Sequence, residues 1–194
     1  MATLEKIKSI DAQDKDIGLK FGHYRHLAEL INRWGFKDVV EVGCAYGNLA
    51  EYLLEHTEIE TLTSVDPYVA YDQMPGLSTQ EDYDTLYDYV NTKLRPDGED
   101  LRFMLIRDTS KSFFNRTWAK GVFKPDFVFL DGDHSYETVS WEIEHYSKLL
   151  KPDTILAGHD ITVFEGVDRA VNEYAQKTGK EIHRLPANIW YFIM

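Results

Sequence analysis

Residues 39–48 read Val39-Val40-Glu41-Val42-Gly43-Cys44-Ala45-Tyr46-Gly47-Asn48. An apolar run that contains one acidic residue passes directly into a turn of small residues and then into the start of a helix. Glycine allows such a turn to approach a ligand closely, because a Cβ at these positions would collide with it. The pattern predicts a strand, a tight turn and a helix that together form one side of a pocket.

A second acidic residue lies at the end of the next predicted strand. Asp66 ends the next apolar run, residues 61–65, about where a ribose-binding carboxylate occurs in a nucleotide-binding β-α-β unit. Together the two signals indicate a nucleoside-cofactor pocket. The dinucleotide pattern G-x-G-x-x-G is absent from the turn, which has G-x-x-x-G, so NAD is disfavoured. An ordinary β-α turn with a surface Asp66 is the alternative.

The composition suits a compact α/β domain. The chain has 194 residues, of which 43% are hydrophobic and 13% aromatic, so we expect a single domain over residues 1–194, with an N-terminal cap at 1–21 and an insertion or lid at 67–98. The net charge of −12 disfavours nucleic acid, because duplex binding depends on lysine and arginine.

Nothing in the sequence predicts a membrane partner or a cysteine-based site. The first residues lack an apolar signal segment and no later run is long enough to cross a bilayer, so we expect a cytoplasmic protein. The single cysteine, Cys44, excludes an intrachain disulfide. We expect a small-molecule partner, and homo-oligomerisation stays open.

Hydrophobic periodicity predicts alternating strands and helices. The expected helices cover about residues 22–34, 48–55, 83–94, 136–150 and 167–176, and the expected strands about 38–42, 61–65, 101–106, 126–130, 154–157, 182–185 and 190–193. Only three residues separate the last two strands, so these must be antiparallel, because parallel neighbours need a longer crossover. The prediction is a Rossmann-like, doubly wound seven-stranded α/β sheet with an antiparallel terminal strand.

With this predicted strand arrangement the chain resembles the class I S-adenosylmethionine-dependent methyltransferases, whose sheet ends in such a reversed strand. Three further segments resemble the family-24 methyltransferase domains, a group similar to macrolide sugar O-methyltransferases and cephalosporin-hydroxylase-like proteins. The segments are Phe129-Leu130-Asp131-Gly132-Asp133-His134-Ser135-Tyr136-Glu137, Leu149-Leu150-Lys151-Pro152-Asp153 and Gly158-His159-Asp160. The resemblance covers nearly the whole chain from about residue 22.

The resemblance implies a set of cofactor contacts. Glu41 would lie beneath the turn near the methionine amino group of S-adenosylmethionine, and Asp66 would accept both ribose hydroxyls. The other implied contacts are Gly43, Cys44, Ala45, Tyr46 and Gly47 in the turn, Asp108, Thr109 and Ser110 after the third strand, and Asp131 after the fourth. A simple helix N-cap by Asp108 or Ser110 is the alternative for the third group.

The resemblance also implies a reactive end. Asp131 and Asp160 follow neighbouring strands and become candidate ligands for a divalent metal, with His159 or Asp133 next; we favour Mg²⁺, which prefers oxygen ligands. His159 stands where related sequences carry a second acid, which weakens the metal prediction. Asp131, His134 and His159 are the catalytic candidates, since imidazole titrates near neutral pH. Helix capping by Asp133 and backbone capping by the histidines are the alternatives.

The expected function is O-methylation of a small hydroxylated metabolite, a sugar or natural product, with a divalent metal as a possible assistant. One alternative is a non-catalytic cofactor-binding module. Another is a magnesium-dependent phosphatase with Asp131 as nucleophile in a D-x-D motif. Glu142 and Glu144 are expected on a solvated helix face. Tyrosines at 68, 71, 83, 87 and 89 predict either an aromatic substrate wall or a hydrophobic cluster.

Overall fold

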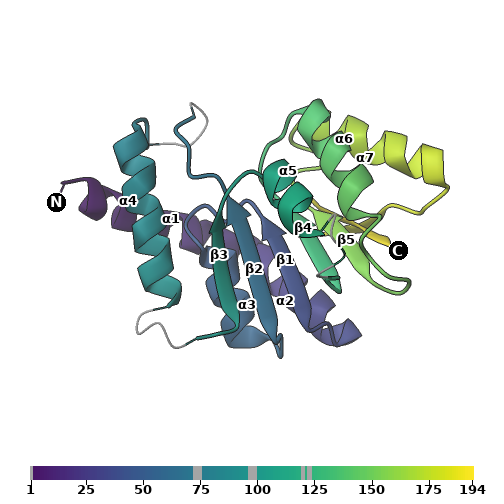
Figure 1. The fold of residues 1–194 in the computed structure, drawn as a ribbon, viewed down its shortest axis with the longest axis horizontal. Helices are drawn as coiled ribbons and strands as arrows, with labels where there is room; N and C mark the ends of the chain where they lie inside the picture. Colours follow the sequence, from purple (N-terminus) through teal and green to yellow (C-terminus); the bar gives the residue numbers. More distant parts are fainter. Residues whose placement is uncertain (1, 72–75, 96–99, 119–120, 122–123) are drawn as a thin grey trace.

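The computed structural model describes residues 2–71, 76–95, 100–118, 121 and 124–194. Strands and helices alternate along most of the chain (Figure 1). In chain order the elements are α1 (Ala2–Phe21), α2 (His23–Trp34), β1 (Asp38–Val42), α3 (Asn48–His56), β2 (Thr61–Asp66), α4 (Gln80–Leu94), β3 (Phe103–Arg107), α5 (Ser110–Phe113), a π-helical turn (Phe114–Trp118), β4 (Phe127–Leu130), α6 (Tyr136–Tyr146), β5 (Ile155–Gly158), α7 (Glu165–Thr178), β6 (His183–Leu185) and β7 (Ile189–Ile193).

The sheet has seven strands in the order β3-β2-β1-β4-β5-β7-β6. The first five are parallel, whereas β7 is antiparallel to both of its neighbours. The β6–β7 turn is possible because Ala187 and Asn188 both adopt positive φ values, 62° and 57°. The predicted fold class and terminal antiparallel strand are therefore confirmed.

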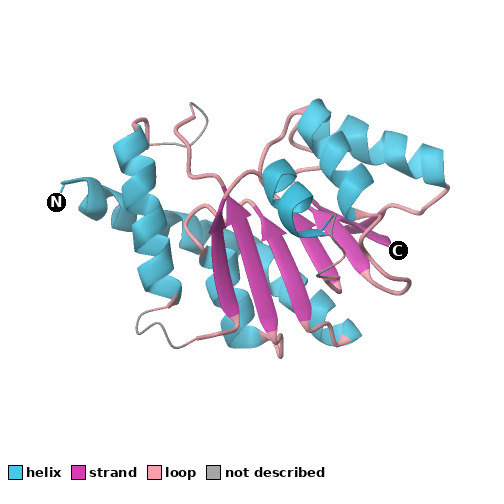
Figure 2. Cartoon of the chain, in the orientation of Figure 1, coloured by secondary structure: helices cyan, strands magenta, loops and turns pink. Residues whose placement is uncertain are grey.

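The parallel strands β1, β2, β4 and β5 bury both faces, so their side chains alternate between two cores. In β4, Phe127 and Phe129 belong to the core shared with α2 and α3, while Val128 and Leu130 belong to the core shared with α6 and α7. Figure 2 shows the sheet between these helical layers. Since strands that run in parallel all end at the same edge, the loops after β1, β2, β4 and β5 lie together there.

Several predicted boundaries need correction. α4 begins at Gln80, not at residue 83, because Thr79 and Asp82 form a capping box at its start. β3 begins at Phe103 rather than 101; the side chain of Leu101 is 88% exposed. α6 ends at Tyr146 rather than 150, and a turn precedes β5.

The N-terminal segment forms α1, which contacts α2, α3 and α4. Of the tyrosines in the predicted insertion, Tyr68 and Tyr83 are buried in the core, Tyr87 and Tyr89 pack against it, and Tyr71 is exposed. Four of these five tyrosines therefore belong to or pack on the hydrophobic core, and Tyr71 does not. Parts of the insertion, 72–75 and 96–99, lie outside the described residues, and the lid stays a prediction. Among the described residues, no helix has the length and apolar character of a membrane span.

Candidate functional site

The glycine turn, residues 43–47, is packed against the loop that follows β4. Gly43 has a φ of +91°, and a Cβ there would lie 2.1 Å from the backbone oxygen of Asp131. Gly47 has a φ of +73°, and a Cβ there would lie 2.9 Å from side-chain atoms of Val90 and Leu94 in α4. Neither position therefore accepts a larger residue without displacing its neighbours. The turn is held between β4 and α4 by close contact.

The carboxylate of Asp66 fixes the glycine turn to the end of β2. Its Oδ2 accepts hydrogen bonds from the backbone amides of Cys44 and Ala45, both 3.0 Å long. Its Oδ1 accepts one from the amide of Tyr68 at 2.9 Å. Burial raises the pKa of Asp66, and these three bonds oppose the shift. Asp66 is thus the last residue of β2, and its contacts are with backbone amides of the turn and of Tyr68.

Glu41 lies beneath the turn, as the sequence predicts, and it is 2% exposed. Ser64 in β2 donates a hydrogen bond to its Oε2. Burial raises the pKa of Glu41 to about 8, an effect that the Ser64 bond opposes and the nearby charge of Asp131 reinforces. The side chain therefore adds a neutral or weakly ionised carboxyl below the turn at pH 7.

The residues after β3 are arranged differently from the prediction. Thr109, rather than Asp108 or Ser110, is the N-cap of α5, and its hydroxyl oxygen accepts a hydrogen bond from the amide of Ser112. The hydroxyl of Ser110 donates a hydrogen bond to the carboxyl group of Glu142 in α6. Glu142 is 2% exposed. The expectation that Glu142 lies on a solvated face is therefore wrong, and burial raises the pKa of Glu142 to about 7.

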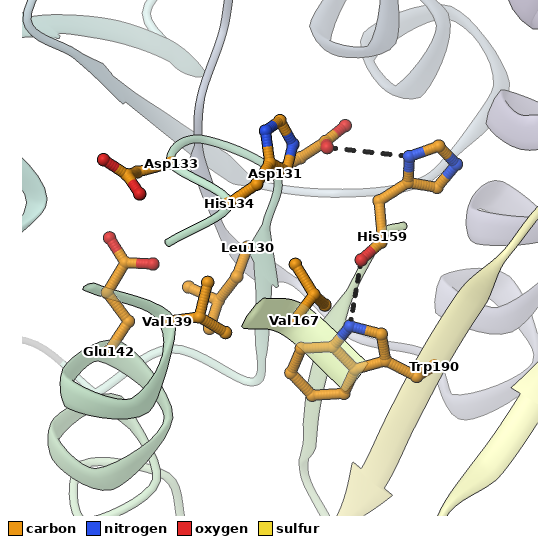
Figure 3. Close-up of a pocket in the computed structure, with 9 residues that line it drawn as sticks. All are labelled: Leu130, Asp131, Asp133, His134, Val139, Glu142, His159, Val167 and Trp190. Carbon is orange, nitrogen blue, oxygen red and sulfur yellow. Dashed lines mark hydrogen bonds and ion pairs between the residues drawn. The ribbon is translucent and has the colours of Figure 1, made fainter. Parts of the chain in front are cut away.

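A pocket lies between the loops after β4 and β5 and helices α6 and α7. It is lined by Leu130, Asp131, Asp133, His134, Val139, Glu142, His159, Val167 and Trp190 (Figure 3). At its edge, Nδ1 of His159 lies 3.6 Å from Oδ1 of Asp131 and 3.1 Å from Oδ1 of Asp160. Burial alone would lower the pKa of His159, but the two carboxylates outweigh it and raise this pKa to about 10.

Asp160 joins this group to a second histidine. Nε2 of His134 lies 3.1 Å from Oδ2 of Asp160, and this interaction raises the pKa of His134 despite burial. Asp160 itself has a φ of +62°, an uncommon conformation outside glycine that is often found at functional positions. Burial would raise the pKa of Asp160, but His134 and His159 hold it well below its usual range.

Asp133 is set apart from these groups. Its Oδ1 accepts from the amide of Ser135 at 2.6 Å, and Ser135, not Asp133, is the N-cap of α6. The N-cap expected at Asp133 is therefore found two residues later. The remaining acidic and imidazole groups, Asp131, His134, His159 and Asp160, form what we call the histidine–carboxylate cluster.

The structure adds His23 to this cluster. His23 is the first residue of α2, and its ring stacks on that of His159 with a centroid separation of 4.2 Å and an interplanar angle of 5°. Its Nε2 is buried and has no hydrogen-bond partner. Burial lowers the pKa of His23 to about 4, although Asp131 opposes this. No local sequence pattern marks His23, because only the tertiary fold brings α2 to the ends of β4 and β5.

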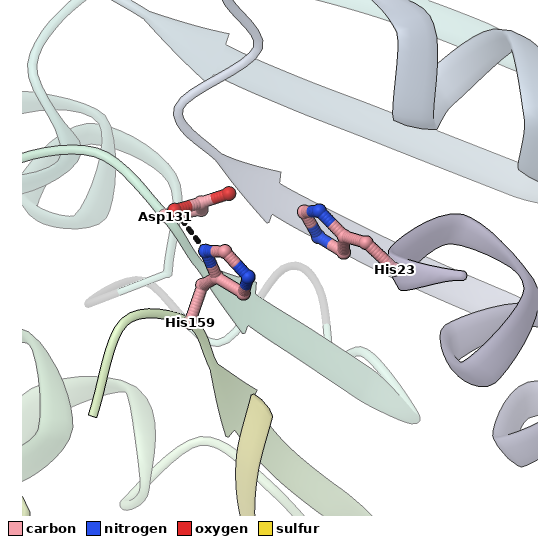
Figure 4. A group of neighbouring side chains, drawn as sticks. All are labelled: His23, Asp131 and His159. Carbon is pink, nitrogen blue, oxygen red and sulfur yellow. Dashed lines mark ion pairs between the residues drawn. The ribbon is translucent and has the colours of Figure 1, made fainter. Parts of the chain in front are cut away.

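Two triads of ligand atoms in the described part of the chain are close enough together to hold a metal ion. One is His23, Asp131 and His159 (Figure 4), and the other is Asp131, His134 and Asp160; within each, the atoms lie within 4.8 Å of one another. Asp131 belongs to both. The expected ligands Asp131, His159 and Asp160 are thus neighbours, and the triads extend them to His23 and His134.

The sheet order, the reversed β7 and the turn-and-acid pair at β1 and β2 define a class I methyltransferase fold. The sequence profile of a methyltransferase-domain family, family 24, matches residues 40–161, which include the glycine turn and the histidine–carboxylate cluster apart from His23. The chain belongs to this family. A comparison with curated protein sequences gives no significant match.

Solved structures with this fold include several O-methyltransferases. The O-methyltransferase from Bacillus cereus in complex with SAH has a TM-score of 0.60 and 13% identity, over 100% of this chain and 91% of that one. The O-methyltransferase NovP has a TM-score of 0.61 and 16% identity, over 90% and 78%. The O-methyltransferase TomG from Streptomyces achromogenes, involved in tomaymycin synthesis and solved with SAM, has a TM-score of 0.62 and 9% identity, over 89% and 79%.

Proposed function

We propose that this methyltransferase uses S-adenosylmethionine to methylate a hydroxyl group of a small metabolite, a sugar or natural product. The observation that carries the proposal is the contact between Gly43 and the backbone of Asp131. Because of this contact, the turn expected to hold the cofactor lies beside Asp131, which belongs to both triads of possible metal ligands. A methyl donor and a proton acceptor need this proximity, because transfer is an in-line displacement that depends on alignment.

In the proposed cofactor pocket, each element of the turn has a separate role. The amides and small side chains of residues 43–47 would line the methionine part, with Glu41 beneath its amino group. Asp66 would accept a hydrogen bond from the ribose, because its carboxylate has about four acceptor positions and the three amide bonds leave one of them for a hydroxyl. Residues 108–110 would face the adenine edge. The B. cereus and TomG structures were solved in complex with SAH and SAM, which supports this choice of cofactor.

At the reactive end, we propose that Asp131, Asp160 and His159 hold a divalent cation, for which Mg²⁺ is the expectation from the sequence. The buried, unpartnered Nε2 of His23 supports a cation here, because the His23 ring lies in one triad of ligand atoms with Asp131 and His159. Such an ion lowers the pKa of an acceptor hydroxyl and orients it. His134, which lines the pocket, is the proposed proton acceptor when His159 holds the ion, and His159 is its competitor for that role in a site without an ion.

Isothermal titration tests the cofactor assignment. We expect micromolar binding of S-adenosylmethionine and S-adenosylhomocysteine and none of NAD, each measured with and without Mg²⁺. A panel of hydroxylated sugars and phenols, followed by mass spectrometry for a gain of one methyl group, then tests the acceptor class. Binding without turnover over the whole panel would favour the non-catalytic module, and failure of both sulfur nucleosides to bind would refute the cofactor pocket.

A further inference from the structure

We propose that the site takes a transition-metal dication, bound by His23, Asp131 and His159. This deepens the proposed function, on which it rests, by naming the ion class and by putting His23 in place of Asp160 as the third ligand. The three ligand atoms lie within 4.8 Å of one another, and Figure 4 shows the three side chains converging from α2, the end of β4 and the end of β5.

The donor set decides the ion class. Two imidazoles and one carboxylate suit Zn²⁺, Co²⁺, Fe²⁺ or Mn²⁺, whereas Mg²⁺ prefers oxygen ligands and retains several waters. A site of oxygen donors alone would use Asp131 and Asp160 without His23. The proposal therefore differs from the magnesium expectation in a measurable property, the order of affinities among metal ions.

Besides the short distances within the triad, the unpartnered ring nitrogen of His23 indicates a metal ion. A buried ring nitrogen without a partner costs free energy, and Nε2 of His23 is such a nitrogen. The flat stacking of His23 on His159 holds the His23 ring beside His159, and both rings form one triad with the carboxylate of Asp131. A metal ion would give that nitrogen the partner that the protein does not supply.

The fold places His23 there through Gly22. Gly22 has a φ of +74° and separates α1 from α2, so His23 begins a new helix instead of continuing the first. One turn further along α2, His26 lies 3.8 Å from Glu29 and belongs to neither triad. His26 is therefore a matched control on the same helix.

The test uses chelator-treated full-length protein without cofactor. Co²⁺, Mn²⁺, Zn²⁺ and Mg²⁺ are titrated separately by calorimetry, and Co²⁺ binding is also followed by its visible absorption. We expect Co²⁺ and Zn²⁺ to bind at least about tenfold more tightly than Mg²⁺. His23→Ala should weaken Co²⁺ binding by about tenfold or more and change its spectrum, because loss of even an outer-shell partner costs this much. His26→Ala should match the parent protein.

Three results would overturn the proposal. The first is Mg²⁺ binding as tightly as Co²⁺, and the second is full Co²⁺ affinity in His23→Ala. The third is loss of Co²⁺ binding in His134→Ala but not in His23→Ala, which would move the ion to the other triad. His23→Asn provides a second variant if His23→Ala does not fold, as judged by circular dichroism. S-adenosylmethionine titration of the same samples separates failure of the metal site from failure of the cofactor pocket.

Discussion

The glycine turn and the histidine–carboxylate cluster lie side by side, but they are built in different ways. The turn is made of backbone: Gly43 touches the backbone of Asp131, and Asp66 accepts from main-chain amides. The cluster is made of side chains, in which His159 lies near two carboxylates and stacks on His23. The comparison teaches that the proposed binding half of the site depends on shape, and the proposed reactive half on charge and ligand chemistry.

The largest effect should come from breaking the shape of the turn. Gly43→Ala introduces a Cβ 2.1 Å from a backbone oxygen at a φ of +91°, and neither β1 nor β4 can move away without disturbing the sheet. We expect a loss of unfolding free energy of ~3 kcal/mol or more, measured by urea denaturation. Gly35→Ala is the control: its φ is +68° but no atom lies within 4 Å of the added Cβ.

The control should cost only the left-handed backbone conformation, roughly 1–2 kcal/mol. Equal losses in Gly43→Ala and Gly35→Ala would contradict the view that close contact between turn and β4 loop defines this half of the site.

Removing the acid that fixes the turn should have the next largest effect. Asp66→Ala leaves the amides of Cys44 and Ala45 without their acceptor and removes the proposed ribose ligand. Because a hydrogen bond to a charged group contributes about 1.5–3 kcal/mol, we expect S-adenosylmethionine affinity to fall by more than about tenfold in calorimetry. Asp88→Ala, on the exposed face of α4, is the control, and unchanged affinity in Asp66→Ala would remove Asp66 from the pocket.

The same contrast explains what the sequence can predict. The turn and Asp66 belong to one β-α-β unit of consecutive residues, so a local pattern identifies them, and β1 matches its predicted bounds, Asp38–Val42. His23 escaped prediction because its partners are distant in sequence and only helix packing brings them together. Helical periodicity predicts a solvated Glu142, because it does not reveal the hydrogen bond that Ser110 donates to Glu142 in the interior.

The capping residues illustrate a further limit. Asp108, Thr109 and Ser110 are all good N-cap residues, and composition alone does not choose between them. The backbone chooses Thr109, whose φ of −72° and ψ of 150° place its hydroxyl at the amide of Ser112. Such choices of one residue depend on how β3 leaves the sheet, which the local sequence does not encode.

A change confined to the cluster should spare the turn. Asp160→Asn keeps a residue that tolerates the φ of +62°, but it removes the charge beside His134 and His159. We expect metal-dependent methyl transfer to fall by about 10- to 100-fold, as for partners that orient metal ligands, with S-adenosylmethionine affinity unchanged. A variant whose activity still responds fully to metal would exclude Asp160 from the reactive half.

The effect that is smallest per unit of pH, no more than about 1.4 kcal/mol, sharpens the boundary between the two halves. Glu41 lies beneath the turn but is influenced by the charge of Asp131, and burial raises its pKa to about 8 from an ordinary value of 4.5. Between these two pH values the unfolded chain loses the proton that the folded protein keeps. The stability contributed by this group is therefore complete below pH 4.5 and is lost as the pH rises towards 8, by up to about 1.4 kcal/mol per pH unit.

Glu41→Gln cannot ionise, so its unfolding free energy should lack this decline. The measurement is urea denaturation at several pH values, with the difference between variant and parent protein as the quantity compared. Glu55→Gln, at an exposed position of α3, should follow the parent. Parallel curves for Glu41→Gln and the parent protein would mean that Glu41 is ionised in the fold, and the layer beneath the turn would then belong with the charged half of the site.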